Sequence, residues 1–304
     1  MSEQRIDLEQ LMYLSDSKTA INETRANPNY VNVSSLHSLC ARQHYFANTM
    51  NNKLPMAQYT GGNVQITFCM GRALEDYFKS RFIEHIPITK VLGYWELRGR
   101  DPIDSKYVKL RKNKKGIEVP HECRFGTLDD TLDDYAEIQV VSDKYKCIGH
   151  MDWVYLDDNG KLSITELKSI SRPMFNDNFV NKTRPVPLPE HVQQLSPYLY
   201  LLPEVPFVKD KGLEVNRDGR IFYICKDFRQ RTQEEKTKRQ NSNYRSFKVS
   251  LANESVRTKN LLSESKLAIE SIQNGAIPPR TMCKDYTCST AKKCPFVARC
   301  FNVD

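Results

Sequence analysis

The chain lacks the features that mark membrane and secreted proteins. None of its apolar runs approaches the roughly 20 residues that a transmembrane helix needs. The segment 1–7 has no basic stretch followed by an apolar core, so we expect no secretory signal, no membrane partner and a cytoplasmic protein. Structural disulfides are rare in the cytoplasm. The nine cysteines therefore need another explanation, at least where they cluster.

The chain also contains no internal repeat, no low-complexity tract and no phosphate-binding P-loop. Without a P-loop, any unwinding of a duplex has to come from a partner protein. What is present is a chain of 304 residues, with 39% hydrophobic and 27% charged residues, which suits a globular protein with one large or two modest domains. The net charge of +8 is compatible with a polyanionic partner but does not require one.

The segment 149–168 carries the strongest local signal. Two apolar runs are joined by Asp157-Asp158-Asn159-Gly160, and Asn-Gly between such runs predicts a β-hairpin. Asp152 would lie in the first strand, with Glu166 and Lys168 in the second, two residues apart and on one face. Burying such charges is costly unless a divalent cation binds the carboxylates and a bound anion lies near the lysine. The plainer interpretation is an exposed polar face.

Apolar spacing and chain breaks predict the other elements and their order. That order favours the α/β class, with a mixed sheet flanked by helices rather than a doubly wound sheet. The expected helices cover 32–48, 68–86, 190–202 and 249–274, and the expected strands cover 88–98, 117–126, 135–141 and 220–226.

Two basic segments could contact nucleic acid. The segment 109–116 is expected to be a loop, either a solvated turn or a phosphate contact. The segment 226–248 mixes Lys, Arg and Gln with Phe228, Tyr244 and Phe247, which suits base stacking on a single strand. A mobile solvated loop explains the second composition equally well.

Two predicted helices carry polar residues on informative faces. Glu75 falls among the apolar residues of the helix 68–86, where a buried carboxylate would need a partner; the alternative is that it faces water. Gln194 and Tyr198 are four residues apart and share one face of the helix 190–202. Pro197 would kink or shorten that helix.

These residues occur in an order that resembles the PD-(D/E)xK nuclease superfamily, over about residues 34–304. Gly149-x-x-Asp152 followed by Glu166-Leu167-Lys168 resembles its motifs II and III. Gly71-Arg72-Ala73-Leu74-Glu75 looks like the helix motif of the RecB-like branch, and Gln194-Leu195-Ser196-Pro197-Tyr198 looks like the Q-x-x-x-Y motif of that branch.

The cysteines add a further match. RecB-like nucleases of the CRISPR-associated and AddB types, and related phage proteins, carry one cysteine before the core and three after it, which hold a 4Fe–4S cluster. Cys40, Cys294 and Cys300 match three of these positions. The fourth ligand is Cys288 or, alternatively, Cys283, because the chain lacks the C-x-x-C that the family often has there. Zinc is the alternative metal, and unligated buried thiols suit the remaining cysteines, Cys69, Cys123, Cys147 and Cys225.

The resemblance implies a restriction-endonuclease-like core with an iron–sulfur-stapled helical cap, forming one nuclease domain. The helical segment 1–67 would carry the first cluster cysteine, 68–248 the core, and 249–304 the last helix and the cluster tail. The implied function is a metal-dependent DNA exonuclease that prefers single strands and uses Mg²⁺ or Mn²⁺.

The resemblance also assigns roles to residues. Asp152, Glu166 and Glu75 would bind metal, with the backbone carbonyl of Leu167 as a candidate fourth ligand. Lys168 would orient or deprotonate the attacking water, or offset charge on the scissile phosphate. Gln194 and Tyr198 would position the active site or the DNA backbone.

Two other classes of function stay open. The first is a DNA-end-binding or processing subunit of a recombination or CRISPR-adaptation complex, working with a helicase or recombination partner, in which cleavage is secondary. The second is a small-molecule metal hydrolase.

Overall fold

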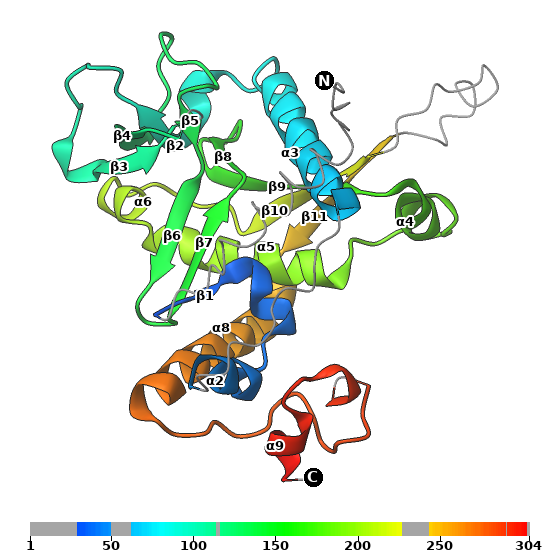
Figure 1. Cartoon of the computed structure of the whole chain (residues 1–304). Helices are drawn as coiled ribbons and strands as arrows, with labels where there is room; N and C mark the ends of the chain where they lie inside the picture. Colours follow the sequence, from blue (N-terminus) through cyan, green and yellow to red (C-terminus); the bar gives the residue numbers. More distant parts are fainter. Residues whose placement is uncertain (1–28, 50–61, 114–115, 227–242, 290, 303–304) are drawn as a thin grey trace, which may run out of the picture.

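The protein is described by a computed structural model that covers residues 29–49, 62–113, 116–226, 243–289 and 291–302 (Figure 1). It is a mixed α/β structure in which an eight-stranded mixed sheet and a three-stranded sheet are flanked by helices. In the described part of the chain, no helix has both the length and the apolar composition to cross a membrane.

The large sheet has the strand order β11-β10-β9-β8-β2-β4-β3, with β5 paired to β2 beside this path. The β9–β10 pair is parallel and every other pair is antiparallel. The strands are β2 (Val91–Glu96), β3 (Val108–Lys112), β4 (Glu118–Phe125), β5 (Tyr135–Ala136), β8 (Trp153–Leu156), β9 (Leu162–Ile170), β10 (Asp218–Cys225) and β11 (Tyr244–Ser250).

The predicted hairpin is present as β8–β9, with Asp157 accepting hydrogen bonds from the backbone N–H groups of Asn159 and Lys161. Gly160 has φ of 73°, the left-handed conformation that an Asn-Gly turn supplies. The first arm is shorter than expected. β7 (Cys147–Met151) leaves the large sheet and pairs with β6 (Ile138–Ser142) and β1 (Val31–Asn32). Asp152 lies at the point where the chain passes from one sheet to the other.

The helices differ from the predictions mainly at their ends. The helix expected over 32–48 is divided into a 3-10 turn, Val33–Ser38, and α2 (Ala41–Thr49). α3 (Gly62–Phe82) begins earlier than predicted, while α8 (Leu251–Asn274) matches closely. α5 (Pro189–Leu201) continues through Pro197 for another turn. The short helices are α4 (Arg172–Phe175), α6 (Pro206–Asp210) and α9 (Val297–Phe301).

Two predicted loops contain strands. The basic segment 109–116 is not a loop throughout, because β3 pairs with β4 up to Lys112. Part of the segment 226–248 is β11, which pairs with β10 as the edge strand. Alternation is weak in both segments because basic side chains take partly buried positions while apolar or aromatic ones are exposed. Arg111 is less exposed than Leu110 on β3, and Arg245 is less exposed than Tyr244 on β11, so the period-2 signal is lost. Residues 227–242, including Phe228, lie outside the described residues.

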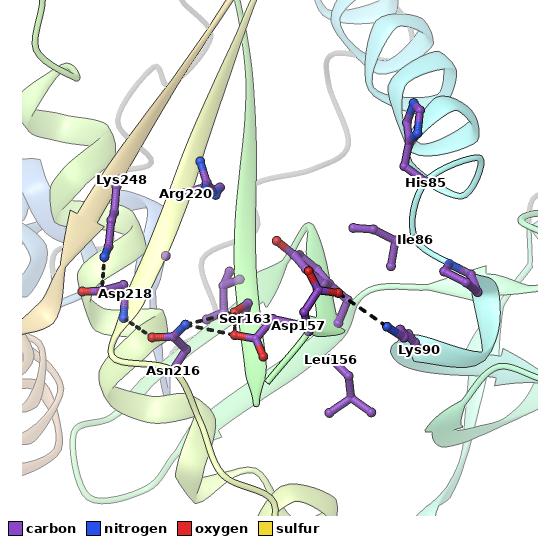
Figure 2. Close-up of a pocket in the computed structure, with 15 residues that line it drawn as sticks. His85, Ile86, Lys90, Leu156, Asp157, Ser163, Asn216, Asp218, Arg220 and Lys248 are labelled. Carbon is purple, nitrogen blue, oxygen red and sulfur yellow. Dashed lines mark hydrogen bonds and ion pairs between the residues drawn. The ribbon is translucent and has the colours of Figure 1, made fainter. Parts of the chain in front are cut away.

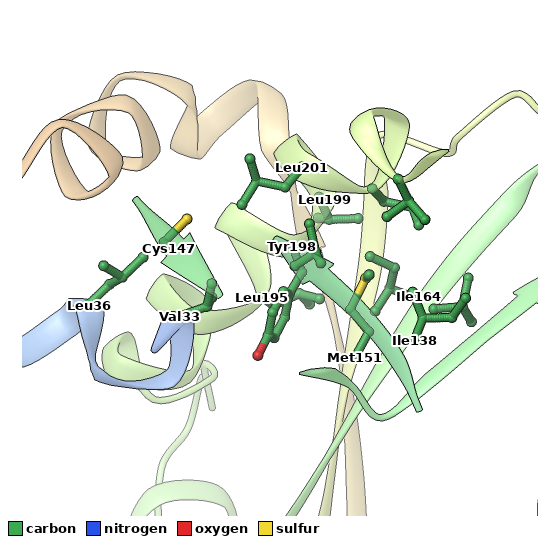
Figure 3. Close-up of a cluster of buried hydrophobic side chains, with 14 of the residues drawn as sticks. Val33, Leu36, Ile138, Cys147, Met151, Ile164, Leu195, Tyr198, Leu199 and Leu201 are labelled. Carbon is green, nitrogen blue, oxygen red and sulfur yellow. The ribbon is translucent and has the colours of Figure 1, made fainter. Parts of the chain in front are cut away.

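The two faces of the β9–β10 pair are covered by different helices. Leu195 and Leu199 of α5 lie against Gly219 on one face, with α8 behind α5. On the other face, Phe78 and Phe82 of α3 contact Phe222. Figure 3 shows the core on the α5 side, where residues of α5 meet β7, β9 and the 3-10 turn.

Gly149 of β7 allows close contact between the small sheet and α5. A Cβ added there would lie 2.7 Å from the Tyr198 ring and 2.9 Å from Val33, both buried. We expect Gly149→Ala to lower the free energy of unfolding by about 1–3 kcal/mol, because one of these groups must move in a packed core. Denaturant unfolding measures this. Val141→Ala, at an exposed site on β6, is the matched control and should change stability by less than about 0.5 kcal/mol; equal effects would contradict the packing explanation.

Candidate active site

Strand β9 presents Glu166 and Lys168 on the face covered by α5. Glu166 has no solvent exposure, and its Oε1 accepts hydrogen bonds from Lys168 Nζ at 2.6 Å and Gln194 Nε2 at 2.5 Å. Its other oxygen, Oε2, is buried and has no hydrogen-bond partner among the described residues. A buried carboxylate oxygen without a partner is costly, so a bound cation or hydrogen-bond donor at this atom would stabilise the site.

Asp152 is held beside β9 by the backbone. Its Oδ2 accepts a hydrogen bond from the N–H of Leu167 at 2.8 Å, and its carbonyl accepts one from the Tyr135 hydroxyl at 3.1 Å. The N–H and C=O of one residue in an extended strand point to the same edge. The Leu167 carbonyl therefore faces the Asp152 side of β9, as a candidate metal ligand should.

Helix α3 contributes Glu75, which is half-buried rather than facing water. Burial and the nearby Asp152 carboxylate raise the pKa of Glu75. Its neighbour Asp76 is exposed, so the helix turns the first of these two acids toward the site and the second away from it.

The structure adds two residues that the sequence motifs missed. Lys79, one turn after Glu75 on α3, forms an ion pair with Glu137 at 2.7 Å, and both groups act electrostatically on Asp152. Burial disfavours the charge of Lys79, but Glu137 and Asp152 outweigh it and hold its pKa above the ordinary value. The i, i+4 spacing of Glu75 and Lys79 was the available signal. Nothing in the sequence pointed to Glu137.

The acidic groups of the site outnumber its basic groups. Glu75, Glu137, Asp152 and Glu166 face Lys79 and Lys168, so the fully ionised set carries a formal charge of −2. Burial and Asp152 raise the pKa of Glu166 to about 8, and Lys168 opposes this only in part. The protein therefore balances the excess charge by protonation, by a divalent cation, or by both.

A hard divalent cation fits these donors, because Mg²⁺ and Mn²⁺ prefer carboxylate and carbonyl oxygens. The unpartnered Oε2 of Glu166 is the specific observation in favour. Within the described residues, however, no three Asp, Glu, His or Cys side chains converge closely enough to hold a metal ion as they stand. A cation held by all three of Asp152, Glu166 and Glu75 therefore requires movement of at least one of these side chains.

Tyr198 lies beneath the site rather than in it. It is 2% exposed, and burial and the Glu166 carboxylate raise its pKa well above the ordinary value. Its hydroxyl lies next to Gly149, in the middle of β7, and Figure 3 shows Tyr198 among the buried side chains of the core. Tyr198 therefore supports the site from the core, whereas Gln194 contacts Glu166 directly.

The cysteines at the two ends of the chain come together beside α2. Cys40, Cys283, Cys294 and Cys300 line one small pocket, against which Phe46 and Phe296 pack. The Cys288 thiol lies beside that of Cys283 and accepts a hydrogen bond from the Ala291 N–H at 3.3 Å. Burial raises the pKa of Cys40, as expected for a thiol shielded from water.

The other described cysteines lie elsewhere. Cys123, Cys147 and Cys225 are buried among apolar residues of the core. This is the environment of a structural thiol. The side chain of Cys69 is outside the described part of the chain.

Comparison with known proteins adds little to this picture. No protein-family model matches the chain, and no curated protein matches it. A solved structure described as the crystal structure of SSO0001 is similar at 15% sequence identity and a TM-score of 0.38, over 95% of this chain and 96% of that one. A likeness at that level carries no functional argument.

The raised pKa of Glu166 predicts how stability depends on pH without metal. Unfolded, the carboxyl ionises near its ordinary pKa of 4.5; folded, it ionises near 8. Between these values the native state keeps a proton that the unfolded state has lost. The contribution of Glu166 is therefore fully present below pH 4.5 and falls by up to about 1.4 kcal/mol per pH unit until about pH 8.

Glu166→Gln removes this titration. We expect the variant to gain stability relative to the parent as pH rises through that window, as measured by urea unfolding in a chelator. Glu118→Gln, at an exposed position of β4, is the control and should track the parent. A constant difference between Glu166→Gln and the parent across the window would contradict the prediction.

Proposed function

We propose that the protein is a metal-dependent DNA exonuclease that prefers single strands and uses Mg²⁺ or Mn²⁺. The observation that carries the proposal is the buried Glu166 carboxylate, with one oxygen unpartnered and the other held by Lys168 and Gln194, beside Asp152. Such a cluster of titratable groups with displaced pKa values is typical of catalytic sites. The order of the sequence motifs resembles that of PD-(D/E)xK nucleases, and this resemblance favours phosphodiester hydrolysis as the reaction.

In this proposal Asp152, Glu166 and Glu75 hold the metal, together with the Leu167 carbonyl. The bound metal supplies a water of lowered pKa and offsets charge that develops on the phosphate. Gln194 fixes the Glu166 side chain. Glu166 and Asp152 hold the pKa of Lys168 above its ordinary value, so Lys168 acts as a cation toward the scissile phosphate rather than as a base that deprotonates water.

The proposed fold is a restriction-endonuclease-like core with an iron–sulfur-stapled helical cap. The mixed sheet with Glu166 and Lys168 on one strand, a preceding helix that carries Glu75 and a following helix that carries Gln194 suits a restriction-endonuclease-like core. The gathered cysteines suit a 4Fe–4S-stapled helical cap made by α2, α8 and the tail. A helicase or recombination protein remains the proposed partner.

One observation favours the second candidate, a DNA-end-binding or processing subunit. The carboxylates of the described residues do not converge on a common point. If they fail to do so with metal present, the protein would bind DNA ends without cutting them.

A digestion assay on end-labelled single- and double-stranded DNA separates the two. With Mg²⁺ or Mn²⁺ we expect cleavage that is faster on single strands. Asp152→Ala and Lys168→Ala should each lower the rate at least about a hundredfold, because charge stabilisation at the phosphate is lost, and should leave DNA binding within a few-fold. Asp101→Ala and Lys209→Ala, at exposed positions outside the site, should cut normally. Undiminished cleavage by both site variants would reject the enzyme assignment.

The cluster has a separate test. Anaerobically purified protein should be brown and contain iron, with Cys40, Cys294, Cys300 and one of Cys288 and Cys283 as ligands. Cys40→Ala should lose the iron and unfold at lower denaturant, because the thiols join the two ends of the chain. Cys225→Ala, a buried thiol far from the cluster, should keep its iron. Colourless parent protein with stoichiometric zinc would replace the iron–sulfur assignment with a zinc site.

A further inference from the structure

The edge of the large sheet has an exposed face that the proposed nuclease centre does not use. On β10, Ile221 and Tyr223 are buried against α5, whereas Arg220 is exposed and Phe222 is half-buried on the opposite face. On β11, Tyr244, Ser246 and Lys248 are exposed on that same side. Together Arg220, Phe222, Tyr244, Ser246 and Lys248 form what we call the β10–β11 face.

The centre of the β10–β11 face is aromatic. The rings of Phe222 and Tyr244 are stacked, with centroids 5.8 Å apart and planes within 15°. α3 covers Phe222 through Phe78 and Phe82, but Tyr244 remains 52% exposed at the edge strand. An exposed tyrosine ring backed by another ring is a rigid platform on which a further flat group can stack.

One end of the β10–β11 face borders a cavity of about 380 Å³ (Figure 2). Arg220 and Lys248 line it from the sheet, and Lys90 and His85 line it from the segment after α3. Lys248 is paired with Asp218 at 2.6 Å, and Lys90 lies 3.8 Å from the exposed Asp158. No described residue forms an ion pair with Arg220, so its guanidinium is the cation available to a ligand here.

We propose that the β10–β11 face binds a single strand of DNA outside the nuclease centre. A base stacks on Tyr244, and Arg220 holds a backbone phosphate at the mouth of the cavity. This inference rests on the proposed nuclease function and adds a second contact with the same substrate. A single strand is the partner that fits, because stacking needs an unpaired base and the cation needs a phosphate a short distance away. This face combines an exposed aromatic ring, Tyr244, with an arginine, Arg220, that forms no ion pair with a described residue. It thereby differs from the isolated apolar side chains exposed elsewhere.

The sheet separates the β10–β11 face from Glu166 and Lys168, although α3, which carries Glu75, packs on the same side as Phe222. In the parallel register, Glu166 lies opposite Ile221 and Lys168 opposite Tyr223, and all four point toward α5. The β10–β11 face lies on the other side of the same strands. It therefore holds DNA that is not being cut, so its effect should appear with strands long enough to reach both sites.

The test measures binding and cleavage separately. Binding of a labelled single strand of roughly 40 nucleotides and of one of roughly 8 is followed by fluorescence anisotropy in an Asp152→Ala background with metal present, since a stacking platform and a backbone groove each occupy several nucleotides. Tyr244→Ala should weaken binding of the long strand about tenfold and Tyr244→Phe much less. Arg220→Ala should weaken it several-fold and reduce the salt dependence by about one ion.

The short strand should bind all variants alike, and its cleavage by the otherwise unmodified enzyme should not change. Arg257→Ala, which removes an exposed arginine on α8, controls for net charge. Thermal unfolding checks that each variant is folded, and Tyr244→Phe keeps the packing against Phe222. Long-strand affinities equal to that of the parent for both Tyr244→Ala and Arg220→Ala would overturn the proposal even if the enzyme cuts DNA. Weakened binding with no cleavage by the parent would instead support this face and reject the nuclease assignment.

Discussion

A carboxylate removed from water has to be compensated by its surroundings, and Glu166 imposes this requirement on much of the structure. Lys168 and Gln194 supply the compensation at one oxygen, and they come from β9 itself and from α5. α5 can approach because Gly149 on β7 leaves room for Tyr198. Packing of the small sheet against α5 is thus tied to the electrostatics of one buried acid. Breaking such a buried set by removing one partner costs far more than an exposed ion pair contributes.

The same reasoning explains why the site contains more charges than the sequence motifs require. Asp152 and Glu75 add negative charge next to Glu166, and each raises the cost of the others. The Lys79–Glu137 pair brings one charge of each sign and leaves the sum unchanged, but it places an ammonium close to Asp152. The pair does not keep Asp152 ionised, because Glu137 opposes the charge of that carboxyl at least as strongly as Lys79 favours it. Burial raises the pKa of Asp152, and Lys168 is the main group that opposes this rise.

Much of the secondary structure and part of the site could be predicted from the sequence. The Asn-Gly turn fixed the β8–β9 hairpin, the spacing of two placed Glu166 and Lys168 on one face, and the helical period identified α3, α5 and α8. The division of β7 from β8 could not be predicted, because Asp152 alone between Met151 and Trp153 is too weak a turn signal and the split arises only when β7 pairs with β6. Glu137 was missed because alternation predicts which face of a strand a residue lies on but not which strands or helices lie next to it. β11 was hidden because Tyr244 is exposed and Arg245 is partly buried, the reverse of the expected alternation.

The passage of the chain through Asp152 has a mechanical consequence. One side of this residue is fastened to a three-stranded sheet and the other to an eight-stranded one, so a rotation of one sheet against the other would change the separation of Asp152 and Glu166. At the far end, β1 continues into the turn that leads to α2, which packs on α8 beside the gathered cysteines. The small sheet therefore connects α2, α8 and the gathered cysteines at its outer end to Asp152 at its inner end. A change in the packing of these helices and thiols would alter the separation of Asp152 and Glu166.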